Sequence, residues 1–479
     1  MADVLIIGGG ICGLGTALLL ARDGHDVTVL ERDAAPVPDK PQDAWDAWER
    51  RGVTQFRQPH NFMPGLRLIL ESELPDVQQA LLDAGASRFD MVNPLPPFFA
   101  DQSPRPIDDK LWTYTARRPA GEWVFADAAR REPRVTVRRG VQAAGLITGA
   151  PALAGTPHVV GVRTDDGEEI RADVVIDAMG RRSRAPAWLA AIGARPPYEE
   201  QADCGFTYYT RYFRGENEPQ RIGPVFMPLG TIAILTLPGD NGTWSMTLLT
   251  ASGDTPLRNL RQPEQWTSVV GAFPLQAHWL DGTPITDVLA MSGVVDRYRR
   301  FVVDGSPVAT GFLAVGDAWA CTNPSAGRGL TVGLMHAVRL RDAMREATDD
   351  PCALVLRFDE KTEADVAPWY HAQIAADRMR FATIDALREG REPPGPGDEL
   401  SRQLVMLLNA VATDPDLFRA ALEYVGTITP IQEIMKRPAV VEGVLAAKDV
   451  PPIQLPGPSR EQLLELVERR PKTSSWVGC

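Results

Sequence analysis

The stretch from Val4 to Glu31 constrains the fold of this chain more than any other segment. It reads VLIIGGGICGLGTALLLARDGHDVTVLE, so an apolar strand runs into Gly8, Gly10 and Gly13, and apolar residues at helical spacing follow. A glycine turn between a strand and a helix collects backbone N–H groups and the positive end of the helix dipole at one point, where a diphosphate binds. The segment therefore predicts a Rossmann-type βαβ unit that binds a dinucleotide.

Each residue of this motif has a mechanical role. Gly8 permits the tight turn, Gly10 lets the backbone approach a diphosphate, and Gly13 lets the helix pack closely on the strand. Glu31 ends the second strand, where its carboxylate is expected to accept hydrogen bonds from an adenosine ribose. A glycine-rich turn without a ligand is the alternative, but strand, glycines, helix, strand and acid all occur in order. The predicted contacts of this unit are Gly8, Gly10, Cys12, Gly13, Glu31 and Arg32.

A second signature lies at residues 311–333, GFLAVGDAWACTNPSAGRGLTVG. A short apolar strand ends in Gly316-Asp317, and an apolar helix follows Gly329. An aspartate at this point can bind a polyol chain or can cap a helix, and the residues alone leave both open. The predicted cofactor contacts of this segment are Asp317, Pro324, Gly327 and Gly329.

Together with RRPAGEW at 117–123, these blocks resemble the FAD-dependent monooxygenases of the single-component aromatic hydroxylase type, with the related epoxidases and halogenases. The resemblance covers roughly residues 3–345. It implies that the glycine motif holds the ADP half of FAD, that Asp317 binds the ribityl chain, and that Arg118 opens a helix near the diphosphate. It also implies that reduced flavin reacts with O₂ to give a C4a-hydroperoxide.

The segment 174–184, VVIDAMGRRSR, departs from that family. The family has Asp-Gly after this strand, whereas this chain has Met179 before Gly180. Asp177 lies two positions earlier, on the same face of a strand, and is a candidate cofactor contact, or else it simply ends the strand. Because the family aspartate lies on the path of NADPH, the electrons are expected from NAD(P)H or from a partner flavin reductase. Arg181 or Arg182 is the alternative contact for a nicotinamide phosphate.

The region from 196 to 295 has a β pattern and is expected to form the substrate domain. In GFTYYTRYF (205–213) the aromatic residues alternate between two faces, and Thr231–Pro238 and Thr243–Thr250 read as two further strands. An aromatic sheet over a flavin would form a pocket for an apolar organic substrate, although such a stripe also occurs in ordinary cores. The family resemblance places Arg57 and His60 beside the flavin, as candidate catalytic residues.

Composition narrows the class of protein. The 479 residues are enough for two or three domains, and the net charge of −12 argues against a nucleic-acid partner. No apolar run is long enough for a membrane span, and no signal peptide is recognisable. The five scattered cysteines, Cys479 among them, have no metal-ligand spacing and fit a reducing cytoplasm, where we expect the protein.

The predicted fold class is α/β. We expect a discontinuous Rossmann-type FAD-binding domain (1–195 and 296–348), an inserted β-sheet substrate domain (196–295) and a helical C-terminal cap (349–479). In the cap, helices are expected at 354–388, 400–425, 430–448 and 461–469, with a loop at REPPGPGDE.

The leading functional hypothesis is an FAD-dependent monooxygenase that hydroxylates or epoxidises an apolar organic substrate with O₂, in a biosynthetic pathway. A flavin halogenase is less favoured, because the family's Trp-x-Trp-x-Ile-Pro motif is absent and only Trp45-x-x-Trp48 occurs. An FAD-dependent reductase or oxidase of the same fold and a non-catalytic flavin-binding protein remain as alternatives.

Overall fold

The computed structural model describes residues 1–451 and 454–468. A five-stranded parallel sheet forms its first layer, in the order β21-β10-β1-β2-β6. Short runs of Val, Ile and Leu form these strands, as expected for parallel strands buried on both faces. The strands are β1 (Asp3–Ile7), β2 (Asp26–Glu31), β6 (Val135–Arg139), β10 (Val174–Asp177) and β21 (Phe312–Ala314).

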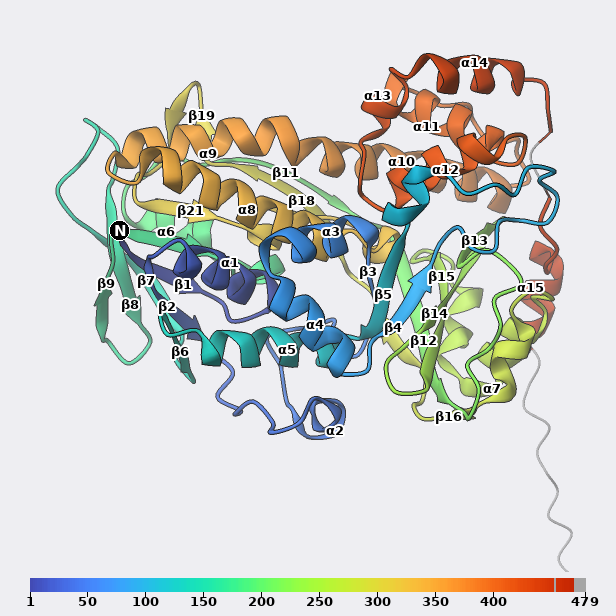
Figure 1. Cartoon of the computed structure of the whole chain (residues 1–479), viewed down its shortest axis with the longest axis horizontal. Coiled ribbons are helices and arrows are strands. Elements are labelled where there is room, and N and C mark those ends of the chain that lie inside the picture. Colours follow the sequence, from blue (N-terminus) through green and yellow to red (C-terminus); the bar gives the residue numbers. More distant parts are fainter. Residues whose placement is uncertain (452–453, 469–479) are drawn as a thin grey trace, which may run out of the picture.

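Helices cover one face of this sheet and an antiparallel sheet covers the other (Figure 1). The helices on the first face are α1 (Ile11–Arg22), α5 (Arg118–Arg131) and α8 (Gly329–Ala347). The covering sheet consists of β7 (Ala143–Thr148), β8 (Val159–Thr164) and β9 (Glu169–Arg171), with α6 (Ala185–Ala191) beside it. This layering confirms the expected Rossmann-type unit and brings the carboxyl ends of β1, β2, β10 and β21 to one edge.

The second large sheet is antiparallel, in the order β13-β14-β15-β12-β16, and β17 also pairs with β12. Its strands are β12 (Phe206–Arg214), β13 (Phe226–Leu229), β14 (Ile232–Pro238), β15 (Thr243–Ala251), β16 (Thr283–Pro284) and β17 (Leu289–Met291). Strand β12 alternates as predicted, because Tyr209 and Phe213 pack in one core cluster and Phe206 and Tyr208 in another. Helices α7 (Pro263–Gly271) and α15 (Arg460–Glu468) cover the first of these faces.

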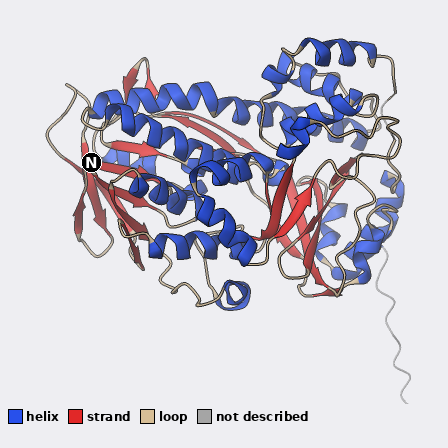
Figure 2. Cartoon of the chain, in the orientation of Figure 1, coloured by secondary structure: helices blue, strands red, loops and turns tan. Residues whose placement is uncertain are grey.

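Smaller sheets connect the two large ones. Figure 2 shows the strands gathered in two groups, at the left and to the right of centre, with helices along the upper side. The connecting strands are β3 (Pro59–Phe62), β4 (Ser87–Asp90), β5 (Trp112–Arg117), β11 (Tyr198–Asp203), β18 (Val295–Arg300), β19 (Val302–Val303), β20 (Ser306–Pro307) and β22 (Ala320–Cys321). The helices in these connections are α2 (Ala44–Ala47), α3 (Pro64–Glu73) and α4 (Pro75–Asp83).

The C-terminal helices are more numerous than predicted. They are α9 (Pro351–Asp365), α10 (Ala367–Arg388), α11 (Glu399–Ala410), α12 (Pro415–Val425), α13 (Ile431–Ile434) and α14 (Pro438–Ala446). The expectation of single helices over 354–388, 400–425 and 430–448 is wrong, because Pro368, Pro415 and Pro438 each lie in the first turn of a new helix. Proline lacks an N–H group and fits only the first turn. The expected helix at 461–469 is α15; residue 469 and Cys479 lie outside the described residues.

None of the helices among the described residues is both long and apolar enough to cross a bilayer.

Candidate active site

A cavity of about 2040 Å³ runs from the glycine turn after β1 to the space between the six-stranded sheet and α10. A site for one small molecule usually measures about 300–1,000 Å³. This cavity therefore has room for a large cofactor and a second compound. We call its two parts the cofactor end, lined by the β1–α1 turn, Glu31, Arg118, Met179 and Asp317, and the far chamber, lined by β13, β14, β17, α10 and α11.

The backbone of the β1–α1 turn forms one wall of the cofactor end. Gly8 has φ +116°, a conformation that favours glycine, and a Cβ on Gly13 would lie 1.9 Å from the carbonyl oxygen of Gly8. Helix α1 begins directly after Gly10, and no side chain caps its first N–H groups. Those N–H groups are therefore available to an anion in the cavity.

Glu31 belongs to a buried network of charges. Its Oε2 accepts hydrogen bonds from Gly9 N at 3.0 Å and from Arg50 Nη2 at 2.9 Å. Arg50, whose side chain is fully buried, also contacts Asp33 Oδ2 at 3.4 Å and Glu122 Oε2 at 3.3 Å. The network fixes the Glu31 carboxylate at the carboxyl end of β2, and Arg32 lines the cavity beside it.

Arg118 is the first residue of α5, as expected, and lines the cavity. Its Nε and Nη2 donate to Glu122 Oε1 at 2.8 and 2.6 Å. Cys12 faces the same space, and burial raises the pKa of its thiol to about 12. Cys12 is therefore a neutral thiol, and its Sγ lies 3.5 Å from Gly333 O.

Asp317 lies in a 3-10 turn, Gly316–Ala318, twelve residues before α8 begins at Gly329. It therefore does not cap α8. Burial raises the pKa of its carboxyl group, while Arg181, Arg118 and Arg297 act in the opposite direction. Its carboxylate has no hydrogen-bond partner among the described residues. The lining around it includes Gly180, Pro324, Gly327 and Gly329.

The structure does not bring Asp177 into the cavity. This residue is fully buried, and its carboxylate accepts hydrogen bonds from Met179 N at 2.9 Å and from the hydroxyl of Ser183. Strand β10 ends at Asp177, so the two-residue strand period no longer relates it to Met179. Met179 itself lines the cavity, and Asp177 stabilises the turn beneath it.

His60 and Arg57 have separate locations. His60 lines the cavity, and its Nδ1 lies 2.9 Å from the carbonyl oxygen of Gln58. A carbonyl only accepts, so Nδ1 carries the proton and Nε2 is a free acceptor. Burial, together with Arg118 and Arg181, lowers the pKa of His60 to about 3. Arg57 is not among the residues that line the cavity. Its guanidinium carbon lies 4.7 Å from the centre of the Trp45 ring, which does not line the cavity either.

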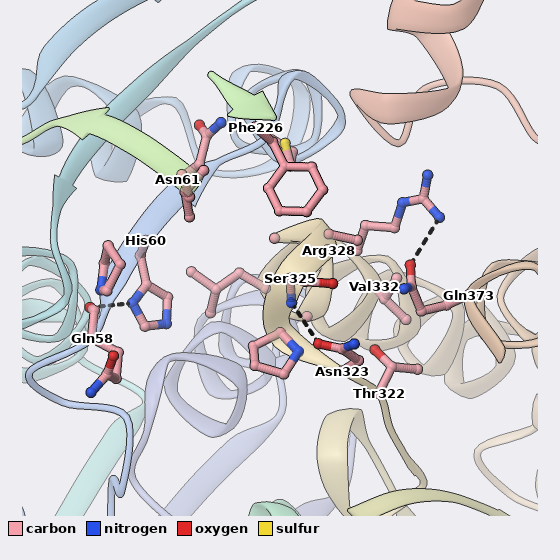
Figure 3. A pocket seen from close by; sticks show the side chains of 18 of the residues that line it. Gln58, His60, Asn61, Phe226, Thr322, Asn323, Ser325, Arg328, Val332 and Gln373 are labelled. Carbon is pink, nitrogen blue, oxygen red and sulfur yellow. Dashed lines mark hydrogen bonds between the residues drawn. The ribbon is translucent and has the colours of Figure 1, made fainter. Parts of the chain in front are cut away.

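The far chamber has apolar walls, and the polar side chains of Arg328 and Gln373 lie on one side of it. Figure 3 places Phe226 between His60 and Asn61 on one side and Arg328 and Gln373 on the other. The apolar lining comes from β13, β14, β17, α10 and α11: Phe226, Leu235, Leu237, Met291, Met379, Ile384, Leu387, Leu404 and Leu408.

A buried hydrogen-bond network lies beside these walls. The hydroxyl of Tyr208 donates to Asn323 Oδ1, and Asn323 Nδ2 donates to Asp377 Oδ1 at 3.1 Å. Gln373 Nε2 donates to both oxygens of Asp377 at 3.1 Å. Burial raises the pKa of Asp377 to about 6. Two amide groups, and no guanidinium, thus hydrogen-bond this carboxylate.

Comparisons with known proteins agree with this geometry. Residues 3–37 match a family model described as FAD dependent oxidoreductase. The chain is 26% identical to protein Rv3254 of Mycobacterium tuberculosis over 86% of its own length and 87% of that protein. It is 23% identical to squalene epoxidase 3 of Arabidopsis thaliana over 72% of its own length and 61% of the epoxidase.

A solved structure shows the same fold. The OxyS anhydrotetracycline hydroxylase of Streptomyces rimosus superposes with a TM-score of 0.55, at 18% identity, over 89% of this chain and 76% of the hydroxylase. The chain has the fold of the FAD-dependent monooxygenases. It is a monooxygenase-like FAD-dependent oxidoreductase.

The residues at the cofactor end fit the FAD of this family. The uncapped start of α1 suits the diphosphate, and the carboxylate of Glu31 suits a ribose. Asp317, with no hydrogen-bond partner of its own, has free acceptors for a polyol chain. Among the described residues, no group of His, Cys, Asp and Glu side chains could hold a metal ion.

Several lining residues of this flavoprotein were not predicted from the sequence. Arg50 lies in WERRG, which matches no motif, and its three carboxylate partners come from two other segments, Glu31 and Asp33 at and just after the end of β2 and Glu122 on α5. Gln373, Asp377 and Arg380 have one detectable signal, because the spacing i, i+4, i+7 places them on one face of a helix. Nothing in that spacing indicates that the face lies against the six-stranded sheet.

Proposed function

We propose that this enzyme inserts one oxygen atom of O₂ into an apolar organic compound, by hydroxylation or epoxidation, in a biosynthetic pathway. The observation that carries this proposal is the continuous cavity, which joins the cofactor end to an apolar chamber. Bound FAD would supply the oxygen chemistry, since a flavin can carry electrons to O₂. The chain would supply binding, orientation and the exclusion of water.

Each cofactor contact has a proposed role. Gly8, Gly10 and Gly13 hold the diphosphate with the help of Arg118, and Glu31 binds the adenosine ribose. The other proposed contacts are Cys12, Arg32, Gly180, Asp317, Pro324, Gly327 and Gly329, which line the same end.

The expected domains give a division of roles. Residues 1–195 and 296–348 bind FAD, and residues 196–295 form the substrate sheet. The proposed cap spans 349–479, and helices α10 and α11 among its described residues (349–451 and 454–468) line the far chamber.

His60 is the proposed catalytic residue. Its Nε2 is an acceptor that faces the cavity, and its ring stays neutral at physiological pH. It can accept a hydrogen bond from a hydroxyl or N–H group without a change of charge. Arg57 has no such place in the proposal, because it contacts Trp45 outside the cavity.

The proposed source of electrons depends on Met179, which occupies the position of the family aspartate. A thioether accepts hydrogen bonds only weakly, and the nearest acid, Asp177, is used within its own turn. We therefore expect a partner flavin reductase to reduce FAD faster than NADPH or NADH alone. Anaerobic stopped-flow at the flavin absorbance band, with a turnover substrate present, measures both rates. Fast reduction by NADPH alone would overturn this, and Arg181 or Arg182 would become the expected nicotinamide-phosphate contacts.

The central experiment follows isotopically labelled O₂. The FAD-loaded enzyme, a flavin reductase and a panel of polycyclic aromatic and polyene compounds should give a product that contains one labelled oxygen atom. Asp317→Ala should lower FAD occupancy and product together, whereas Asp349→Ala, at an exposed position, should change neither. Labelled H₂O₂ without labelled product across the panel would favour an oxidase. We expect FAD to be held without a covalent bond, so acid precipitation should release it, and flavin that stays with the precipitated protein would contradict this.

A further inference from the structure

Two guanidinium groups of the far chamber have no carboxylate partner. Arg328 precedes α8, and Arg380 lies on α10; both line the cavity. Neither forms an ion pair with a described residue. A cation removed from bulk water without a counter-ion is unfavourable, so such groups usually have a partner.

The groups in direct contact with Arg380 are aromatic rings, and the Asp377 carboxylate acts on its charge from beyond ion-pair distance. Its guanidinium carbon lies 4.8 Å from the centre of the Phe206 ring and 5.0 Å from that of Phe226. Both distances are within the range of cation–π contacts. The described residues give it no hydrogen bond, so its five N–H donors are free. Phe226 belongs to the chamber wall, which places these donors beside an apolar surface.

Arg328 is held by neutral partners. Its Nη1 lies 3.1 Å from the hydroxyl of Tyr424 and 3.5 Å from Gln373 Oε1, and its Nη2 donates to Tyr424 O at 3.0 Å. Its Nε is buried without a partner. These contacts fix the side chain in place but leave its charge in the chamber (Figure 3).

Asp377 lies on α10 with Arg380, and both Arg380 and Arg328 act on its charge, but neither arginine forms an ion pair with it. Its oxygens accept from Gln373 and Asn323 at 3.1 Å. Even when Asp377 is ionised, two cations face one anion, so the lined chamber has an excess of positive charge. An anionic group on a bound compound would balance it.

We propose that Arg380 determines substrate specificity by binding a carboxylate at one end of the substrate, while the apolar body of the substrate lies against Phe226 and the chamber wall. This rests on the proposed function only in that the substrate occupies the far chamber. The fork of N–H donors on Arg380 matches a carboxylate, and Arg328 adds to the positive field. The proposed substrate class is therefore an apolar organic compound that carries a carboxylate at one end.

The test compares acids with their own amides. Benzoic, naphthoic, biphenylcarboxylic and dodecanoic acids, each beside its primary amide, are titrated into the FAD-loaded enzyme by calorimetry. At least one acid should bind about tenfold more tightly than its amide, because a charge-assisted hydrogen bond is lost in the amide. Arg380→Gln should remove this preference without a change in amide affinity, and Arg380→Lys should retain part of it.

Arg378→Gln is the matched control. Arg378 is exposed on the same helix, so its loss should leave the preference intact. No acid that binds better than its amide, or an unchanged preference in Arg380→Gln, would overturn the proposal. Inorganic phosphate that displaces the acid at equal concentration would also overturn it, since the site would then be a general anion site. Failure of the proposed function would appear separately, as the absence of labelled product with affinity ratios intact.

Discussion

The two ends of the cavity differ in whether their arginines form ion pairs. At the cofactor end Arg50 is surrounded by Glu31, Asp33 and Glu122, and Arg118 pairs with Glu122 at 2.6 Å. In the far chamber the guanidinium groups contact aromatic rings, amides and a hydroxyl. The charges around Arg50 are balanced before a ligand binds, so the geometry of the cofactor end is set in advance. The guanidinium groups of the far chamber gain a counter-ion only when an anionic ligand binds, so the far chamber is the part that selects the ligand.

The largest expected effect is from Arg50→Met. The change leaves the carboxylates of Glu31 and Asp33 buried without their cation, which should lower the free energy of unfolding by about 3–5 kcal/mol. Urea unfolding followed by fluorescence measures this loss. Arg51→Met should have no measurable effect, because Arg51 is 81% exposed. Equal stabilities for the two variants would mean that the cofactor end is not held by its charges.

Gly13→Ala tests the backbone of the same end. The new Cβ would lie 1.9 Å from Gly8 O, so β1 and α1 must move apart. We expect a loss of about 3 kcal/mol in unfolding free energy and a marked loss of bound FAD. Gly145→Ala is the control, since no atom lies within 4 Å of its new Cβ. Flavin absorbance per mole of protein gives the occupancy, and normal occupancy in Gly13→Ala would contradict the proposed diphosphate site.

His336 makes the cofactor end sensitive to acid. Its Nδ1 accepts from Gly316 N at 3.3 Å, and burial lowers its pKa from 6.5 to about 3. The unfolded chain therefore binds the proton more readily, and stability falls as the pH falls from about 6.5 towards 3. At pH 5 this costs about 2 kcal/mol relative to neutral pH.

His336→Gln should remove this contribution of about 2 kcal/mol, because an amide oxygen accepts the same hydrogen bond without titrating. His60, whose pKa is lowered in the same way, should keep its own contribution. Thermal unfolding at pH 7 and pH 5 measures the difference. His371→Gln, at an exposed position, should retain the wild-type response. A His336→Gln variant with the full wild-type loss at pH 5 would exclude His336 as the cause.

The smallest effect is expected from Arg380→Met, and its sign is opposite to that of Arg50→Met. A cation without a counter-ion is replaced by an apolar side chain of similar length, so the ligand-free protein should gain about 1 kcal/mol. Differential scanning calorimetry should show a slightly higher melting temperature. A clear loss of stability would mean that the contacts with Phe206 and Phe226 outweigh the desolvation of the charge.

The βαβ unit at the cofactor end was predictable from the sequence because its signal is local, whereas Arg50 beside it matches no motif. The predicted strand, helix and strand between 4 and 31 match β1, α1 and β2 closely, since three glycines and one acid define them within 30 residues. Strand β12 was equally clear, because period-two alternation survives in the folded sheet. The C-terminal helices were predicted too long, because helical composition continues across each proline in the first turn of a new helix.

The far chamber could not be predicted in the same way. Arg328 and Arg380 are 52 positions apart, and only the packing of α10 against α8 and the sheet brings them to one cavity. Asp177 and Arg57 failed as cavity residues for a related reason. Asp177 accepts a hydrogen bond from Ser183, and Arg57 contacts the Trp45 ring. Sequence spacing does not indicate such side-chain contacts.

Helix α10 has a practical consequence for protein engineering. A single 22-residue element carries much of one chamber wall, from Gln373 through Asp377 and Arg380 to Leu387, and it contributes nothing to the β1–α1 turn. A library confined to its cavity-facing positions could therefore exchange the accepted compound while the flavin site stays untouched. The same separation would let natural lineages drift towards new substrates through one helix.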